Sequence, residues 1–420
     1  MDLSIFDEWE SEVRGYVRSF PVVFDTAHGS FLVDQDGTEY IDFFSGASAL
    51  NYGHNNPNFK PALIDYLEKG GIIHGLDMAT TAKAEFIGAF TELVLKPRGL
   101  RYKLQFTGPT GANATEAAMK LARLATGRTN VVAFTHGYHG LSLGSLAATA
   151  AQHYRHAGSV PLTNVTFAPY DGYYGAGIDT LALLAKQLDD PSSGLDLPAA
   201  FIVECIQGEG GVNAASGEWL RGLADLARRY SIPLIVDDIQ AGVGRSGDFF
   251  SFEDSGITPD LVVLSKSLSG YGLPMSLVLI NPDLDVWSPG AHTGTFRGNN
   301  LAFVGATAAL KTYWADGAFP AEIKRKGELV RSRLAAIAEQ HPGELDVRGR
   351  GMFLGLASLG DPSFGAKVSQ EAFHHGVIIE TAGARDEVVK FLPALTIDDE
   401  TLLRGLDIVE AAVAAALATV

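Results

Sequence analysis

The chain has 420 residues, 46% hydrophobic and 19% charged, so it can bury a large core and is not disordered over most of its length. Its 49 acidic residues against 32 Lys and Arg give a formal net charge of -17, which argues against a nucleic-acid partner. No stretch approaches the ~20 apolar residues of a membrane span, and the acidic N-terminus lacks signal-peptide features, so we expect a cytoplasmic protein with no membrane partner.

The first 57 residues predict a small β-rich segment. Short strands are expected at 22–25, 30–34 and 39–43, with a hairpin turn at Asp36-Gly37 between the last two.

From about residue 58 the pattern changes to alternating helices and apolar strands. Helical periodicity is present at 58–69, 80–95, 112–126, 216–230, 300–314, 321–340 and 399–418. Apolar runs between these helices are found at 104–108, 130–134, 200–204, 233–237, 261–266 and 276–280. The runs are apolar almost throughout, as expected for parallel strands covered on both faces, so the sequence predicts βαβ units and a doubly wound α/β sheet.

Three of these runs end in a polar residue: Glu204, Asp237 and Lys266. In doubly wound sheets the ligand binds at the carboxyl ends of the strands. We therefore expect the functional site at this edge.

Two further segments can contribute to that edge. Gly108–Glu116 opens a predicted helix with small residues, which indicates either an anion site at a helix N-terminus or a capped helix entry alone. His136–Gly140 holds two histidines, but no third ligand lies at motif spacing, so we predict no metal site. The aromatic residue of this segment, Tyr138, can cover the face of a planar ligand.

Gly242–Gly247 matches the G-x-G-x-x-G pattern of dinucleotide-binding proteins. That site needs a helix to begin there, whereas the following Asp248–Glu253 is aromatic and not helical in pattern. We interpret the glycines as a sharp turn, and an NAD-dependent dehydrogenase is the lesser alternative.

An anion cradle, a ring-covering aromatic, a carboxylate and a lysine at the strand ends of one sheet describe a site for pyridoxal phosphate. That cofactor needs phosphate donors, a flat wall, an acid at the pyridine nitrogen and a lysine for the Schiff base.

The chain resembles the class III pyridoxal-phosphate aminotransferases of fold type I over nearly its whole length, and is most similar to those that form diaminobutyrate in ectoine biosynthesis. The segments that carry the resemblance are Leu50–Pro57, His74–Met78, Gln105–Gly111, Gln207–Gly211, Asp237–Gln240, Leu264–Pro274, Gly294–Asn299 and Val389–Pro393. The resemblance implies transfer of an amino group from L-glutamate to L-aspartate 4-semialdehyde, giving L-2,4-diaminobutyrate and 2-oxoglutarate.

The resemblance also implies a large pyridoxal-phosphate domain, residues 58–315, with a doubly wound, mostly parallel sheet. Residues 1–57 and 316–420 would form a smaller α+β domain. A homodimer or larger homo-oligomer with shared active sites is implied as well.

Carried over by motif, the resemblance gives Lys266 the Schiff-base and proton-shuttle role. Asp237 would hold the pyridine N–H, and Gln240 would contact the ring hydroxyl. Glu209 matches an acidic switch that pairs with a carboxylate-binding cation, and Glu204 would support that region of the cofactor site.

The remaining cofactor contacts also follow from the resemblance. Thr110, Gly111 and Ala112 would bind the phosphate, and Tyr138 would stack on the ring. Thr295 would reach the phosphate of the neighbouring subunit.

Two positions depart from related enzymes. Leu141 stands where γ-aminobutyrate enzymes carry Arg, and Lys390 stands where ornithine aminotransferases place a substrate-binding Arg. Lysine is a point charge and cannot grip a carboxylate bidentately. Lys390 is nevertheless our candidate for the substrate carboxylate, and an ω-aminotransferase for a different terminal amine is the main alternative function.

Overall fold

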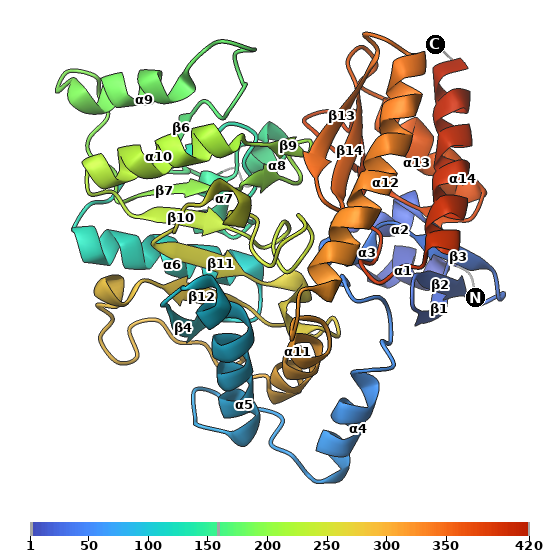
Figure 1. The fold of residues 1–420 in the computed structure, drawn as a ribbon, viewed down its shortest axis with the longest axis horizontal. Coiled ribbons are helices and arrows are strands. Elements are labelled where there is room, and N and C mark those ends of the chain that lie inside the picture. Colours follow the sequence, from blue (N-terminus) through green and yellow to red (C-terminus); the bar gives the residue numbers. More distant parts are fainter. Residues whose placement is uncertain (1–2, 158–159, 419–420) are drawn as a thin grey trace.

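The computed structural model describes residues 3–157 and 160–418, and its centre is a seven-stranded sheet (Figure 1). The strand order is β4 (Lys103–Phe106), β12 (Leu277–Ile280), β11 (Leu261–Leu264), β10 (Leu234–Asp237), β7 (Ala200–Val203), β5 (Val131–Phe134) and β6 (Val165–Ala168). Every residue of the five inner strands from β12 to β5 is buried, which explains why their sequences are apolar throughout.

The sheet is mixed but mostly parallel. The prediction that its strands are parallel is wrong for one of them. Strand β12 pairs antiparallel with both β11 and β4, whereas β11, β10, β7, β5 and β6 are parallel neighbours. A strand buried on both faces is apolar in either direction, so its sequence does not encode its orientation. Strand β6 was not predicted.

All seven predicted helices are present. They are α4 (Lys60–Glu68), α5 (Thr81–Phe90) with its π-helical extension η1 (Thr91–Leu95), α6 (Gly111–Thr126), α10 (Gly217–Arg229), α11 (Asn300–Tyr313), α12 (Ala318–Gln340) and α14 (Asp399–Ala418). Helices α6 and α10 each begin with a side-chain cap, since the side chains of Thr110 and Ser216 accept N-cap hydrogen bonds there. The structure also contains α7 (Leu143–Ala148), α8 (Gln152–Ala157), α9 (Thr180–Asp189) and α13 (Phe364–His374), and of these four α8, α9 and α13 were not predicted.

The two ends of the chain share one sheet. Strands β1 (Phe24–His28), β2 (Phe31–Asp34) and β3 (Glu39–Asp42) are antiparallel neighbours, which confirms the predicted hairpin, and β15 (Val377–Ile378) adds to β3 in parallel. Figure 1 shows the blue N-terminal segment beside the red C-terminal helix. We propose residues 58–315 as the large domain and the two flanking segments as the small one.

The C-terminal segment forms a second, antiparallel sheet. Its strand order is β13 (Leu345–Arg350), β14 (Phe353–Ser358), β17 (Val388–Phe391) and β16 (Glu380–Ala382). The short elements are α1 (Ser4–Trp9), α2 (Tyr16–Ser19), α3 (Ser45–Ser48), β8 (Ile206–Gln207), β9 (Asn213–Ala214), η2 (Lys96–Arg98), η3 (Glu253–Ser255), η4 (Lys266–Ser269) and η5 (Pro282–Leu284). Over residues 3–157 and 160–418, no helix combines the length and apolarity that crossing a membrane requires.

Candidate active site

The three polar residues predicted at the sheet edge follow adjacent strands. Asp237 ends β10, Glu204 comes directly after β7, and Lys266 comes two residues after β11. These strands are parallel neighbours in the order β11-β10-β7, so their carboxyl ends lie along one edge. The sheet therefore brings the three side chains to one region.

Asp237 is held by a histidine that the sequence analysis interpreted differently. The Nδ1 atom of His139 lies 2.7 Å from Asp237 Oδ2, and both residues are almost fully buried. The other carboxylate oxygen accepts a bond from the Ile239 N–H at 3.2 Å. The carboxylate is thus fixed in place, which suits a group that must face a protonated ring nitrogen.

Glu204 lies in the same buried region but supports a loop. It accepts a hydrogen bond from the backbone N–H of Tyr138 at 3.2 Å. Burial raises the pKa of Glu204 well above its usual value, and the nearby charge of Asp237 raises it further. Glu204 therefore anchors the turn that carries Tyr138.

Lys266 begins η4 with a left-handed backbone, φ 49°. Burial lowers the pKa of its amine, and this outweighs the opposing effect of the Glu209 charge; the positive charge of Lys390 also lowers it. A lysine that loses its proton more easily is a better nucleophile towards a carbonyl carbon.

The start of α6 forms a tight, uncharged cradle. The Thr110 hydroxyl caps the helix by accepting the Asn113 N–H at 3.3 Å. A Cβ atom on Gly111 would lie 2.7 Å from Ile239 Cδ1, so a larger residue there would have to displace the Ile239 side chain. The first turn reads Gly-Ala-Asn-Ala, and its free N–H groups together with the helix dipole favour an anion.

Tyr138 lines a cavity of about 1110 Å³ together with Glu209 and Tyr154. Its ring lies 5.5 Å from that of Tyr154, nearly edge-on. Burial raises the pKa of Tyr138, which therefore stays neutral. A neutral aromatic wall beside an open volume suits the face of a planar ring.

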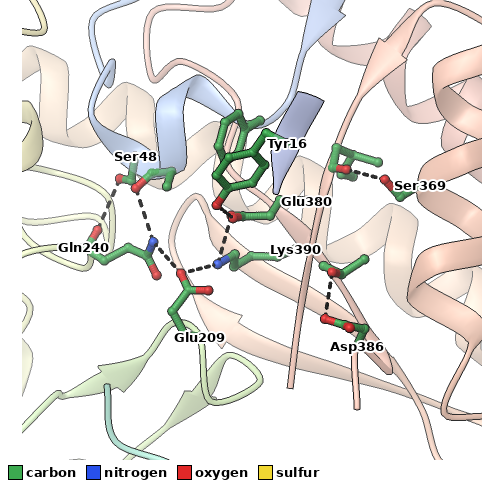
Figure 2. A network of polar contacts seen from close by, with 12 residues as sticks. Tyr16, Ser48, Glu209, Gln240, Ser369, Glu380, Asp386 and Lys390 are labelled. Carbon is green, nitrogen blue, oxygen red and sulfur yellow. Dashed lines mark hydrogen bonds and ion pairs between the residues drawn. The ribbon is translucent and has the colours of Figure 1, made fainter. Parts of the chain in front are cut away.

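The cation near the C-terminus lies between two acids, as Figure 2 shows. The Lys390 ammonium is 2.7 Å from Glu209 Oε1 and 3.0 Å from Glu380 Oε2. The Tyr16 hydroxyl donates to Glu380 Oε1 at 2.6 Å, and the Gln240 amide donates to Glu209 Oε1 at 3.2 Å. We call Lys390, Glu209 and Glu380 the ion triad.

The ion pair between Lys390 and Glu209 favours the ionised form of both groups. Burial would lower the pKa of Lys390, but Glu209 and Glu380 outweigh it and the pKa is raised. Burial would raise the pKa of Glu209, but Lys390 and then Lys266 bring it below its usual value. Burial raises the pKa of Glu380. The charge of Lys390 opposes this rise and the charge of Glu209 adds to it, and the pKa stays above its usual value.

Two predicted residues make no contact that tests their roles. Gln240 donates to the Ala47 carbonyl and to Glu209, both at 3.2 Å. Thr295 is exposed and follows Gly294, whose added Cβ would lie 3.6 Å from the Gly108 nitrogen of the same chain. Their roles towards the ring hydroxyl and the partner's phosphate stay predictions.

The glycine-rich segment Gly242–Gly247 is a buried turn with no helix directly after it; the next helical element is the short η3. Arg245 is fully buried there and donates to Asn51 Oδ1 and to the Pro393 carbonyl, both at 2.7 Å. This geometry joins distant segments of the chain and offers no helix N-terminus for a dinucleotide.

Sequence reasoning missed His139, Tyr16 and Glu380 as parts of this site. His139 was noticed only as a possible metal ligand, because its partner Asp237 lies 98 residues away in the sequence. Tyr16 and Glu380 lie 364 residues apart, so no local spacing predicts their contact.

Comparison with known proteins places these features in a family. The family model described as Aminotransferase class-III matches residues 14–413. A diaminobutyrate–2-oxoglutarate transaminase of Bordetella parapertussis is 61% identical over 418 residues, covering 99% of this chain and 96% of that one. A protein of the same name from Nocardia farcinica is 54% identical over 412 residues, covering 98% of this chain and 94% of its own.

A solved structure agrees with the fold. The ornithine aminotransferase from Toxoplasma gondii, which contains pyridoxal phosphate at partial occupancy in its active site, has a TM-score of 0.85 and 27% identity to this chain. The match covers 99% of this chain and 94% of that one.

The donor set of this chain fits the same cofactor. The α6 N-terminus suits a phosphate, Tyr138 offers a wall for a ring, Asp237 is fixed where it can face a ring nitrogen, and Lys266 has an easily deprotonated amine. The chain therefore belongs to the class-III aminotransferases, which are pyridoxal-phosphate enzymes.

Proposed function

We propose that this enzyme transfers an amino group from L-glutamate to L-aspartate 4-semialdehyde, forming L-2,4-diaminobutyrate and 2-oxoglutarate. The full-length similarity to two diaminobutyrate–2-oxoglutarate transaminases supports this substrate pair. The product would feed ectoine synthesis. The same proposal includes small-molecule partners and a cytoplasmic location.

The contact between Lys390 and Glu209 is the observation that carries the proposal. Glutamate reacts at a carbon that bears a carboxylate, whereas diaminobutyrate reacts at a terminal carbon that bears none. One pocket must therefore offer a cation in the first half-reaction and mask it in the second. Glu209 masks Lys390 at 2.7 Å, and a substrate carboxylate can take its place.

When bound, pyridoxal phosphate supplies an aldehyde that takes up the amino group and a ring that accepts the electron pair left on the substrate carbon. Thr110, Gly111 and Ala112 would hold its phosphate at the start of α6, and Tyr138 would cover its ring. Gln240 would orient the ring through its hydroxyl.

Two residues would handle protons. Asp237, fixed by His139, would keep the proton on the pyridine nitrogen through its carboxylate. The Lys266 amine would bind the cofactor until substrate arrives and then move a proton from the substrate carbon that bears the reacting amine. The lowered pKa of Lys266 favours that second task, because a general base must be free of its proton.

The active enzyme is proposed to be a homodimer with shared sites. Thr295 is exposed on the segment before α11, where it would be available to the phosphate of the partner subunit. This role rests on the family resemblance.

Spectral titration tests the proposed reaction. The enzyme, loaded with pyridoxal phosphate, is mixed in turn with glutamate, diaminobutyrate, ornithine and 4-aminobutyrate, and the cofactor absorbance is followed. We expect glutamate and diaminobutyrate to convert the cofactor to its aminated form at the highest kcat/KM. A preference for ornithine or 4-aminobutyrate would overturn the substrate assignment and leave a different ω-aminotransferase.

A further inference from the structure

The ion triad carries more negative than positive charge. It holds one ammonium, Lys390, which is 0% exposed, and two carboxylates, Glu209 and Glu380. Masking one cation needs one carboxylate, and Glu209 already provides it. The exchange of Glu209 for a substrate carboxylate, which the proposed function requires, therefore does not explain why Glu380 is present.

Glu380 is also the fixed member of the triad. It stands on β16 directly opposite Lys390 on β17, so the strand register holds the two residues together. Glu209 instead lies in the turn after β8. A substrate carboxylate would displace Glu209, while Glu380 stays beside the lysine.

One oxygen of Glu380 retains hydrogen-bonding capacity. Oε1 accepts the Tyr16 hydroxyl, whereas Oε2 is buried and, over the described residues, has no hydrogen-bond partner. Oε2 lies 3.0 Å from the Lys390 ammonium but outside hydrogen-bonding geometry. The ion pair with Lys390 leaves part of the hydrogen-bonding capacity of this oxygen unused, and an added cationic donor would use it.

Space for a ligand group lies beside Glu380. Glu380 and Tyr16 line a second cavity of about 430 Å³. Thr381 and Asp386 line both this cavity and the one that contains Tyr138, so the two cavities adjoin. The basic side chains that line the second cavity are Arg18, which pairs with Glu12, and His374.

We propose that Glu380 is a specificity-determining residue that receives the second ammonium group of a diamino acid while its terminal amine reacts. The inference rests on the proposed function. In that half-reaction diaminobutyrate brings an α-ammonium, which would donate to Glu380 and neutralise the surplus charge of the triad. Glutamate brings no second ammonium and supplies a carboxylate to Lys390 instead. Glu380 thus favours a diamino acid over a simple ω-amino acid.

The test compares two amines that differ only in the α-ammonium group: 2,4-diaminobutyrate and 4-aminobutyrate. Wild-type enzyme is expected to prefer diaminobutyrate in kcat/KM. In Glu380→Gln that preference should fall by about ten- to a hundredfold, the range for hydrogen bonds to charged groups. Because the preference is a ratio between two terminal amines, any change that the substitution transmits through Lys390 is common to both amines and cancels.

Two controls separate recognition from folding. Glu380→Asp keeps the charge and should retain most of the preference, and Glu371→Gln, on α13 away from the triad, should change nothing. If Glu380→Gln does not fold, wild-type enzyme is assayed with 4-amino-2-hydroxybutyrate, which replaces the ammonium by a neutral hydroxyl. It should react at least tenfold more slowly than diaminobutyrate.

An unchanged preference in Glu380→Gln, or equal use of the hydroxy analogue by wild-type enzyme, would overturn the inference. The proposed function would still stand in both cases, because wild-type enzyme would still use diaminobutyrate. Failure of wild-type enzyme to use diaminobutyrate at all would instead overturn the proposed function.

Discussion

The Lys390 ammonium and the Glu209 carboxylate lie 2.7 Å apart although 181 residues separate them in the sequence. Lys390 comes from the second, antiparallel sheet, and Glu209 from the turn that follows β8. The proposed substrate-binding cation and its proposed mask are therefore carried by different parts of the fold, and each can be substituted without the other.

Glu209→Ala should slow the diaminobutyrate half-reaction more than the glutamate half-reaction. Without Glu209, the charge of Lys390 is not neutralised while a terminal-amine substrate is bound, which is unfavourable. Glutamate brings a carboxylate of its own that can pair with Lys390. Single-turnover absorbance measurements with each amino donor give the two rates separately. Equal losses would mean that Glu209 has only a structural role.

Asp237→Asn should be folded but nearly inactive. Removal of one member of a buried charge pair costs ~3–5 kcal/mol, or roughly two to four orders of magnitude if the loss appears in the transition state. Steady-state kinetics and circular dichroism measure activity and folding. An activity loss below tenfold would contradict the assignment to the ring nitrogen.

The two buried lysines should affect stability in opposite directions. The pKa of Lys266 is lowered by burial, so its charged form is disfavoured in the folded state at pH values below its usual pKa of 10.5. Lys266→Met should therefore raise the unfolding temperature of the cofactor-free protein at pH 7.5. This gain should shrink as the pH approaches 10.5.

Lys390→Met is the matched comparison. The pKa of Lys390 is raised by its two carboxylates, so its charged form contributes stability that is fully present below pH 10.5. Its removal leaves buried Glu380 and half-buried Glu209 without their cation and should cost about 3–5 kcal/mol. Chemical denaturation at several pH values measures the free energy of unfolding of both variants. A loss of stability in Lys266→Met would contradict the prediction that the buried charge of Lys266 destabilises the folded protein.

A mixed dimer tests the role of Thr295. Lys266→Ala and Thr295→Ala chains should each be inactive or severely impaired, since one lacks the lysine and the other the proposed phosphate contact. Unfolding and refolding the two chains together should restore part of the activity through dimers with one intact site. If Thr295→Ala alone leaves the affinity for pyridoxal phosphate unchanged, the contact across subunits is absent.

The part of the site that could be predicted from the sequence is the part in which a functional residue comes at the end of a clearly apolar strand. Asp237 and Lys266 each follow a strand whose apolar run is unmistakable, so their positions on the sheet edge followed from periodicity. The direction of β12 did not, because a run buried on both faces reads the same either way. The contact of Tyr16 with Glu380 depends on how the two chain ends pack together, which no local pattern records.

Isotope transfer tests the central claim most directly. The enzyme, loaded with pyridoxal phosphate, is incubated with L-aspartate 4-semialdehyde and L-glutamate labelled with ¹⁵N in its amino group, and the product is analysed by NMR. Our account predicts L-2,4-diaminobutyrate with the label on its terminal nitrogen. No transfer of label to the semialdehyde, while another terminal aldehyde accepts it readily, would contradict the account.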